Sequence, residues 1–223
     1  LQCACRASGP RCELSNEQPT VLVVHALTGD MRAGGPGGFW EPLVGPGRVF
    51  DPSEVRVLGF NNLGSCYGTS GPSDGTNLFP RRCDEPSDCA LPYHGKGAFQ
   101  LDSSQLPATV TTWDQARSIL MALDALGIER VHLATGGSLG GMIVLALSML
   151  DPDRFERIAP IATAERSSPW SIGWNHIGRQ AILADPGFPE STTRGLELAR
   201  QLAMMTYRSD RSFRERHGRR LAG

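Results

Sequence analysis

Short apolar runs without polar alternation recur along the chain and alternate with stretches that carry a helical repeat. We interpret four of these runs as strands, at residues 20–25 (TVLVVH), 55–60 (VRVLGF), 130–135 (RVHLAT) and 157–163 (RIAPIAT). Continuous apolar runs are typical of strands that are buried on both faces of a parallel sheet. Because strands alternate with helices, the sequence predicts an α/β fold with a mostly parallel sheet.

Two segments carry the helical repeat. The first begins at Thr112, where the sequence TWDQ fits a capping box, and Gly127 is expected at the C′ position that ends it. Its apolar positions fall on one face and are Ala116, Ile119, Leu120, Leu123 and Leu126. The second helix follows Ser138, and its apolar face is formed by Leu139, Met142, Ile143, Ala146, Leu147 and Leu150. Each helix is therefore expected to pack its apolar face against the sheet.

Two stretches rich in glycine and proline interrupt this pattern. Residues 34–47 are expected to form a loop around the pair Phe39 and Trp40. A second stretch, at about 73–107, has no apolar period and is longer than an ordinary connection between elements. We interpret it as a surface excursion or an insertion on the side of a lid.

The hexapeptide GGSLGG, at residues 136–141, directly follows the third predicted strand and opens an apolar helix. This is G-x-S-x-G at a strand–turn–helix junction, the nucleophile elbow of α/β-hydrolases. In so tight a turn the serine is expected to have strained backbone angles, and Gly136 and Gly140 must lack side chains so that strand and helix can cross. The helix amino end is then directed at the hydroxyl. We therefore predict Ser138 as the catalytic nucleophile.

A second part of this site is expected after an earlier strand. One oxyanion donor in this fold is the amide after the nucleophile, and the other comes from a loop that follows a preceding strand. The segment HALTG, at residues 25–29, occupies that place. We predict the backbone N–H groups of Leu27 and Leu139 as the two donors. His25 precedes the nucleophile, whereas this fold supplies its base after it, so we interpret His25 as a structural histidine beneath the loop.

Composition narrows the classes of function. The chain has 223 residues, with 22 Lys and Arg against 23 Asp and Glu, for a formal net charge of −1. This balance provides no basic surface to gather phosphates, so we expect no nucleic-acid partner. No window approaches about 18 consecutive apolar residues, so we also expect no membrane span.

The cysteines provide no pattern of metal ligands. They are Cys3, Cys5, Cys12, Cys66, Cys83 and Cys89, with no C-x-x-C pair. No metal site is therefore predicted. We expect free thiols in a reducing compartment and a cytoplasmic location, although Cys83 and Cys89 could close a small loop if oxidised. The first dozen residues have no apolar region of the kind found in a secretory signal.

Several segments resemble the successive motifs of the homoserine O-acetyltransferases, the MetX-type acyltransferases of methionine synthesis. The main ones are HALTG (25–29), NNLGSCYGTSGP (61–72), GGSLGGM (136–142) and NHIGRQAILADP (175–186). Shorter similarities follow at 194–200, 206–209 and 218–221. The resemblance runs in order from about residue 20 onward, apart from the insertion. It is more specific than the elbow alone.

The resemblance implies a two-step, ping-pong transfer through an acyl-enzyme on Ser138. Ser138 would take an acetyl or succinyl group from acetyl-CoA or succinyl-CoA, and the hydroxyl of L-homoserine would then receive it. Arg179, which matches the arginine of the family's G-R-Q-A-I segment, would bind the carboxylate of the amino acid. The alternative for Arg179 is a solvated helix charge. No bound cofactor is implied, and the family is expected to form a homodimer through lid helices.

The resemblance also implies a triad Asp and His after the nucleophile, on loops beyond a helical lid. After Ser138 we predict one more strand and then helical, charged sequence. The acidic and imidazole groups considered there are Asp185, Asp210, His176 and His217. None of them follows a predicted strand, so none is assigned to a triad. We expect an incomplete α/β-hydrolase core at 1–165 and the beginning of a helical lid at 166–223.

Alternatives stay open at this level. The chain could be a fragment truncated on its carboxyl-terminal side, could pair with a second chain that supplies the missing strands, or could be a degenerate member that only binds. Alternative functions are a serine O-acyltransferase, an ester hydrolase of the same fold, and an inactive fragment or scaffold that lacks the triad Asp and His. Arg179 favours the transferase, because an ester hydrolase has no general need to bind a carboxylate. Residues 61–65 are expected in the pocket wall. They do not distinguish serine from homoserine as the acceptor, because the two differ by one methylene, which changes the binding free energy by only about 1–3 kcal/mol.

Overall fold

The computed structural model describes residues 18–65, 67, 69, 110–188 and 190–218. The chain divides into two compact units, Leu1–Glu165 and Arg166–Gly223, and each unit is described by itself. All six cysteines and the stretch at 73–107 lie outside the described residues. The expectations for those residues therefore stay predictions.

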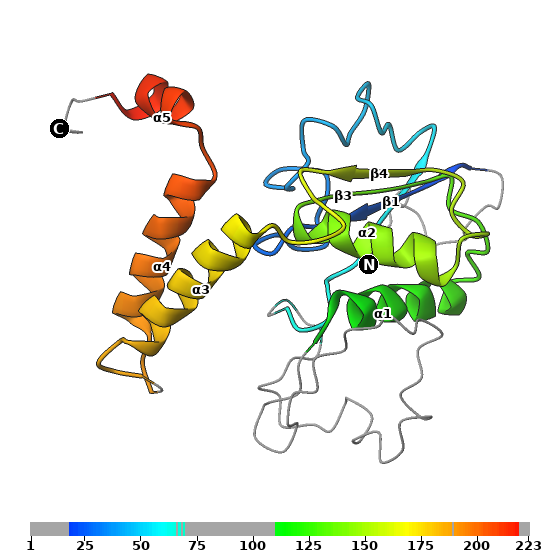
Figure 1. The fold of residues 1–223 in the computed structure, drawn as a ribbon. Coiled ribbons are helices and arrows are strands. Elements are labelled where there is room, and N and C mark those ends of the chain that lie inside the picture. The colour runs from blue at the N-terminus through cyan, green and yellow to red at the C-terminus, as the bar shows by residue number, and fades with distance from the viewer. Residues whose placement is uncertain (1–17, 66, 68, 70–109, 189, 219–223) are drawn as a thin grey trace, which may run out of the picture. The chain divides into compact units, whose positions relative to one another are not determined.

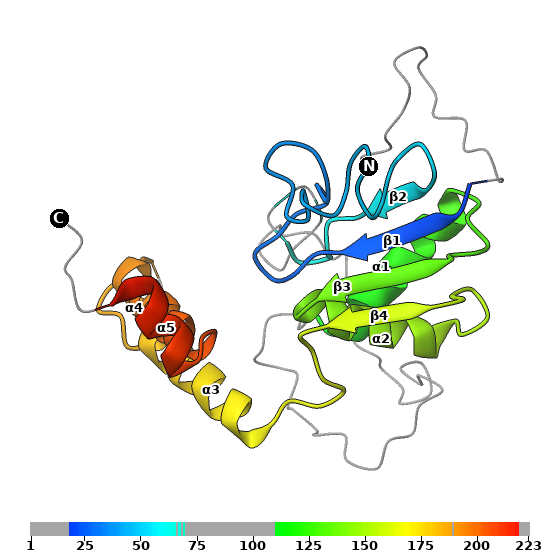
Figure 2. The same cartoon turned by 90° about the horizontal axis from the view of Figure 1, so that it is seen from above.

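The first unit is built on a sheet that contains four strands within the described residues (Figure 1 and Figure 2). The strands are β1 (Thr20–Val24), β2 (Arg56–Gly59), β3 (Leu133–Gly137) and β4 (Ile158–Ile161). Their order across the sheet is β2-β1-β3-β4, and each adjacent pair is parallel. The expected α/β fold with a parallel sheet is confirmed. Because all strands run the same way, the loops after them meet at one edge of the sheet.

Two helices, α1 (Thr112–Ala125) and α2 (Leu139–Leu150), cover one face of the sheet (Figure 1). Leu22 and Val24 of β1 pack with them in the larger core cluster. The helix residues buried in this cluster are Ala116, Ile119, Leu123, Ile143, Val144, Ala146 and Leu147. Most positions of the apolar faces expected from the sequence are thus buried, while Leu120, Leu126, Leu139 and Leu150 are partly buried against the cluster. Val144 widens the buried face of α2, because α2 contacts both α1 and the strands.

A long loop, residues 31–55, covers the opposite face of the sheet around β1 and β2. The buried cluster on this face contains Val21, Val23, Ala33 and Val44. Phe39 and Trp40 pack against the cluster, with 5.6 Å between their ring centroids. The expected loop around this aromatic pair is present and acts as a covering layer. β1 is therefore buried on both faces, which explains its uninterrupted apolar run.

The capping box of α1 lies one residue earlier than expected. Thr111, not Thr112, is the N-cap, because its hydroxyl accepts a hydrogen bond from the Asp114 N–H. The Asp114 carboxylate in turn accepts one from the Thr111 N–H at 2.8 Å. The box requires its partner at the third helical position, and only Thr111 has a carboxylate there. At the other end Gly127 follows the C-cap Leu126 with a φ of +64°, as a C′ glycine does.

The third strand also differs from the expected range of 130–135. β3 extends through Gly136 and Gly137, because Gly136 pairs with Val24 of β1 and Gly137 pairs with Ile161 of β4. Glycine is disfavoured in strands by propensity, so a sequence pattern ends the strand before it. Here the tertiary neighbours on both sides extend the pairing to the turn.

The second unit contains three helices within the described residues, α3 (Pro169–Leu183), α4 (Thr193–Thr206) and α5 (Asp210–His217). α3 and α4 pack side by side (Figure 1). They approach closely at Gly195, where an added Cβ would lie 2.8 Å from the Cα of Ile182. The Asp185 carboxylate joins the helices, since it accepts hydrogen bonds from the Gly195 N–H at 2.6 Å and the Gly187 N–H at 2.9 Å.

Candidate active site

The turn between β3 and α2 lies at the carboxyl edge of the sheet (Figure 2). It holds Ser138 as the N-cap of α2, with φ 54° and ψ −116°. Such a backbone conformation costs about 1–3 kcal/mol for a residue with a side chain, and strained residues of this kind cluster at active sites. The Ser138 N–H donates to the Ile161 carbonyl at 2.9 Å, so the end of β4 helps to hold the turn. Ser138 itself is exposed.

Glycines on both sides of Ser138 let the strand and the helix meet. A Cβ on Gly136 would lie 2.6 Å from the carbonyl carbon of Gly140. A Cβ on Gly140 would lie 2.8 Å from the carbonyl oxygen of His25, at the end of β1. Real Cβ atoms are essentially never found so close to other atoms. The need for glycine at these positions therefore comes from packing against α2 and against the loop after β1.

The loop after β1 thus lies against the first turn of α2. Its residues Ala26 to Gly29 form a turn in which the Gly29 N–H donates to the Ala26 carbonyl at 3.0 Å. Within the part of the chain that the structure describes, the N–H groups of Leu27 and Leu139 donate to no other group. Two available donors therefore lie on two elements that are in contact. An oxyanion hole requires donors of this kind.

His25 lies beneath this loop and is 1% exposed. Its Nδ1 is 2.7 Å from the Ala26 carbonyl oxygen, and its Nε2 accepts a hydrogen bond from the Asn62 N–H at 3.0 Å. Burial lowers the pKa of His25 below the usual 6.5, although the hydrogen bond to Ala26 and the charge of Asp30 act in the opposite direction. A buried, neutral imidazole with both nitrogens engaged agrees with the structural interpretation of His25.

Two asparagines after β2 hold the two ends of this loop. The side-chain amide of Asn62 donates to the carbonyl of His25 at 3.1 Å. The side-chain oxygen of Asn61 accepts a hydrogen bond from the Met31 N–H at 2.7 Å. Sequence reasoning placed both asparagines only in a pocket wall and missed these contacts. The signal that could have found them is their position directly after a strand that pairs with β1.

Arg179 lies on α3 and is exposed. It belongs to the second unit, whereas Ser138, Leu27 and Leu139 belong to the first. The structure therefore places the predicted nucleophile and oxyanion donors on contacting elements of one unit, and Arg179 on a helix of the other. The role of Arg179 in binding a carboxylate stays a prediction.

The carboxylates and imidazoles considered for a triad lie in the second unit; they are Asp185, Asp210, His176 and His217. Asp185 caps α4, and the N–H groups of Gly195 and Gly187 hold the pKa of its carboxyl below the usual value. Asp210 pairs with Arg214 at 2.9 Å on α5. The ring of His217 lies 4.5 Å from that of Phe213 on the same helix. These groups have local roles in their own unit, and none is assigned to a triad.

His132 is the other described histidine of the first unit, and it lies at the opposite edge of the sheet. Its Nδ1 accepts a hydrogen bond from the N–H of Thr20, the first residue of β1, at 3.0 Å. Its Nε2 is 3.3 Å from the Glu156 carboxylate. The imidazole therefore ties together the amino ends of the strands and is not a base for Ser138.

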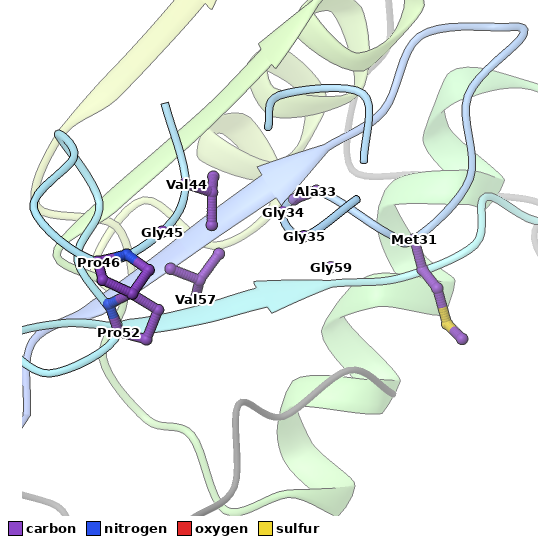
Figure 3. Close-up of a pocket in the computed structure, with 10 residues that line it drawn as sticks. All are labelled: Met31, Ala33, Gly34, Gly35, Val44, Gly45, Pro46, Pro52, Val57 and Gly59. Atoms are coloured by element: carbon purple, nitrogen blue, oxygen red, sulfur yellow. The ribbon is translucent and has the colours of Figure 1, made fainter. Parts of the chain in front are cut away.

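A pocket lies between the 31–55 loop and β2 (Figure 3), and no residue of 136–141 lines it. It is lined by Met31, Ala33, Gly34, Gly35, Val44, Gly45, Pro46, Pro52, Val57 and Gly59. None of these is a predicted site residue, and none is charged.

Among the described residues no three His, Cys, Asp or Glu side chains gather as they would around a metal ion. In the same part of the chain, no helix is long and apolar enough to cross a membrane.

Comparison with known proteins agrees with the observed fold. The model of the α/β-hydrolase fold family matches residues 19–208. The chain is 39% identical over 215 residues to the homoserine O-acetyltransferase of Moorella thermoacetica, which is 90% of this chain and 52% of that protein. It is 37% identical over 216 residues to the homoserine O-succinyltransferase of Aromatoleum aromaticum, again 90% of this chain and 52% of that protein.

The crystal structure of homoserine O-acetyltransferase from Staphylococcus aureus is also similar. It matches with a TM-score of 0.64 and 30% identity, over 91% of this chain and 52% of that one. The resemblance to homoserine O-acetyltransferases inferred from the motifs is thus confirmed by similarity over most of the chain. The chain spans about half the length of the curated relatives it matches.

Proposed function

Because the chain belongs to the α/β-hydrolase fold family, we propose that it supplies the nucleophile and the oxyanion hole of a homoserine O-acyltransferase. The observation that carries the proposal is the strained, exposed Ser138 at the start of α2, next to a loop with an available amide. Similarity to homoserine O-acetyltransferases over 90% of the chain supports the choice of acyl transfer to homoserine.

In the first proposed step, the Ser138 Oγ attacks the thioester carbonyl carbon of acyl-CoA and gives its proton to a general base. The tetrahedral intermediate carries negative charge on the former carbonyl oxygen, which the N–H groups of Leu27 and Leu139 would stabilise. Each such donor is worth about 10²–10³ in rate. The C–S bond then breaks, CoA leaves as the protonated thiol, and the acyl group stays on Ser138.

In the second step, the side-chain hydroxyl of L-homoserine attacks the acyl-enzyme. Its proton passes through the base to the Ser138 Oγ, the ester bond to Ser138 breaks, and O-acylhomoserine leaves. Arg179 would orient the amino acid, because a planar guanidinium can donate two parallel hydrogen bonds to its carboxylate. No cofactor is consumed, since acyl-CoA is a substrate.

The proposal requires a His and an Asp that act as base and orienting group for Ser138. Among the described residues of the first unit, no such pair lies beside Ser138. The proposed activity therefore belongs to a protein in which other residues supply the His and the Asp. The resemblance also supports association through the helices of the second unit, a place in methionine synthesis and a cytoplasmic location. These belong to the same proposal.

Acetyl-CoA is the proposed donor, because the M. thermoacetica and S. aureus relatives are named as O-acetyltransferases. Succinyl-CoA is the alternative, because the A. aromaticum relative is named as an O-succinyltransferase. L-Serine is the alternative acceptor. Water would make the protein an ester hydrolase.

The test is to incubate the protein, with the His and Asp pair supplied, with each CoA donor, with and without each amino acid, and to measure free thiol and the mass of the peptide that contains Ser138. We expect thiol release and an acylated peptide with acetyl-CoA, and neither with S138A. Thiol release that S138A retains would reject the covalent route, and release without an O-acyl amino acid would indicate a hydrolase. If a serine-directed phosphonate does not label Ser138 when the His and Asp pair is supplied, the chain acts as a scaffold.

A further inference from the structure

We propose that His25, held by Asn62, is a positioning residue that fixes the direction of the Leu27 N–H. The inference rests on the proposed function, because it assigns a purpose to His25 only if Leu27 is an oxyanion donor. It is carried by a chain of hydrogen bonds that runs from Asn62 through both ring nitrogens of His25 to the Ala26 carbonyl.

The partners of His25 allow only one tautomer. The Asn62 N–H is a donor, so Nε2 of His25, 3.0 Å away, must be the unprotonated nitrogen. The Ala26 carbonyl can only accept, so Nδ1, 2.7 Å from it, must carry the proton. The Asn62 side-chain nitrogen, 3.4 Å from Nδ1, cannot donate to a protonated nitrogen and instead donates to the His25 carbonyl. The backbone of Asn62 thereby selects the Nδ1–H form.

The proton on Nδ1 acts on the peptide unit that contains the proposed donor. The Ala26 carbonyl and the Leu27 N–H belong to one planar trans peptide, in which the C=O and N–H bonds point in opposite directions. Holding the Ala26 oxygen therefore sets the direction of the Leu27 N–H. Two donors hold that oxygen, His25 Nδ1 at 2.7 Å and the Gly29 N–H at 3.0 Å.

The surroundings of the pair favour a positioning role over a packing role. His25 and Asn62 are 1% and 2% exposed, so their polar atoms are withdrawn from water. The side-chain oxygen of Asn62 is buried and has no partner within the described residues. An apolar pair would avoid that cost, so hydrogen-bond geometry and not stability accounts for a buried His and Asn here. Asn61 holds the far end of the loop through Met31.

The first test reads the tautomer directly. A ¹⁵N spectrum of the imidazole of His25 in the 223-residue chain distinguishes a protonated from an unprotonated ring nitrogen. We expect protonated Nδ1 and unprotonated Nε2 at about neutral pH. We also expect a scalar coupling across the hydrogen bond from Nδ1 to the Ala26 carbonyl. The opposite tautomer, or an imidazolium, would overturn the inference whether or not the protein is an enzyme.

The second test separates the two hydrogen bonds of the ring. In H25N the side-chain nitrogen can occupy the place of Nδ1 and still donate to the Ala26 carbonyl, whereas the partner of the Asn62 N–H is lost. In H25Q the amide reaches the place of Nε2, so the bond to Asn62 is kept and the bond to Ala26 is lost. Each variant loses one hydrogen bond, and only H25Q releases the peptide that carries the Leu27 N–H.

We expect labelling of Ser138 by the phosphonate to slow about tenfold or more in H25Q and less than about threefold in H25N, as misdirecting one oxyanion donor predicts. Amide hydrogen exchange of Gly29, whose N–H donates to the same Ala26 carbonyl, should rise in H25Q alone. Q115A is the matched control, since Gln115 donates to the Leu63 carbonyl at 3.0 Å in the segment next to Asn62 but does not touch the loop after β1.

The outcomes separate this inference from the proposed function. If wild-type Ser138 is not labelled when the His and Asp pair is supplied, the proposed function fails, and the imidazole spectrum and the exchange of Gly29 still decide the role of His25. If H25N and H25Q lose labelling and protection of the Gly29 amide equally, in line with their thermal stability, His25 is structural only and the inference is wrong. A Q115A variant that slows labelling as much as H25Q does would also overturn it.

Discussion

At the scale of single residues, backbone geometry decides what the elbow can do. Ser138 has a positive φ although it carries a side chain, and its neighbours Gly136 and Gly140 carry none because backbone atoms fill the space. The strain at Ser138 is balanced by the paired strand before it and the helix after it. The motif G-x-S-x-G is therefore a packing requirement as much as a chemical one.

This packing predicts the effect of a methyl group at Gly140. In G140A the new Cβ would meet the carbonyl oxygens of Val24 and His25, so either α2 or the loop after β1 must move. We expect the free energy of unfolding to fall by about 1–3 kcal/mol or more, and labelling of Ser138 to slow further than stability explains. Urea denaturation and phosphonate labelling measure the two effects.

Gly137 is the matched control for this prediction, because a Cβ there would meet nothing within 4 Å. G137A should keep stability within about 1 kcal/mol of the wild type. Equal losses in G140A and G137A would show that close packing at the elbow is not what requires glycine.

A second prediction at this scale concerns His25 and pH. Burial lowers the pKa of His25 in the folded chain below its usual 6.5, so folding favours the neutral ring. The stabilisation is fully present above about pH 6.5 and is lost as the pH falls through the lowered pKa. The nearby Asp30 carboxylate limits the shift, because its charge favours the imidazolium.

The measurement is the free energy of unfolding of the wild type and of H25N between about pH 8 and about pH 5. H25N has no titrating group at this position and shares all the others. We expect the stability advantage of the wild type over H25N to shrink as the pH falls below about 6.5. A constant difference over this range would contradict a neutral, buried His25.

At the scale of elements, termini are determined by caps and by neighbouring strands. The capping box of α1 shifts by one residue from the place where sequence spacing puts it, and β3 continues through two glycines. The cap differs because the sequence offers two adjacent threonines as N-cap residues. The strand end differs because the low strand propensity of glycine predicts that the strand stops before Gly136. Hydrogen bonds to Asp114 and to β1 and β4 determine both positions.

The cap assignment predicts opposite results for the two threonines. T111A removes the acceptor of the Asp114 N–H and should lower the free energy of unfolding by about 1 kcal/mol. T112A lies inside α1, where alanine is a better helix former, and should change stability by less than about 0.5 kcal/mol. Thermal or urea denaturation decides, and a larger loss in T112A would favour the cap expected from the sequence.

At the scale of the whole molecule, the residues predicted for the site belong to two compact units. The first unit holds the predicted nucleophile and oxyanion donors, and among the described residues β4 is an edge strand, in which Ile158 and Ile161 are 37% and 48% exposed. The second holds Arg179. In the proposed reaction, acyl transfer from CoA would use the groups of the first unit together with a base, whereas Arg179 would act only on the acceptor.

This division predicts a selective effect for Arg179. R179A should raise the KM for homoserine while thiol release in the thioester half-reaction changes little, because the carboxylate is present only in the acceptor. Q180A, the next position on α3, is the control for general damage to the helix. Equal loss in both half-reactions would argue against carboxylate binding by Arg179.

Much of the fold follows from local spacing. The parallel α/β class, the apolar faces of α1 and α2, and the junction that carries Ser138 were all predictable, because each depends on residues within one element or one turn. Motif order also predicted the similarity to homoserine O-acetyltransferases. The position of the loop at 25–29 could be expected for the same reason.

The support of that loop could not be predicted from spacing. Asn62 and His25 are 37 residues apart, and their contact exists only because β2 pairs with β1 and both loops meet at one edge. Likewise, the tautomer of His25 follows from its partners and not from its neighbours in sequence. By itself the sequence determined which elements form and where the candidate nucleophile lies, because periodicity and turn chemistry are local. Only the tertiary structure decided what holds the candidate oxyanion donor, because hydrogen bonds between distant segments depend on how the strands are ordered.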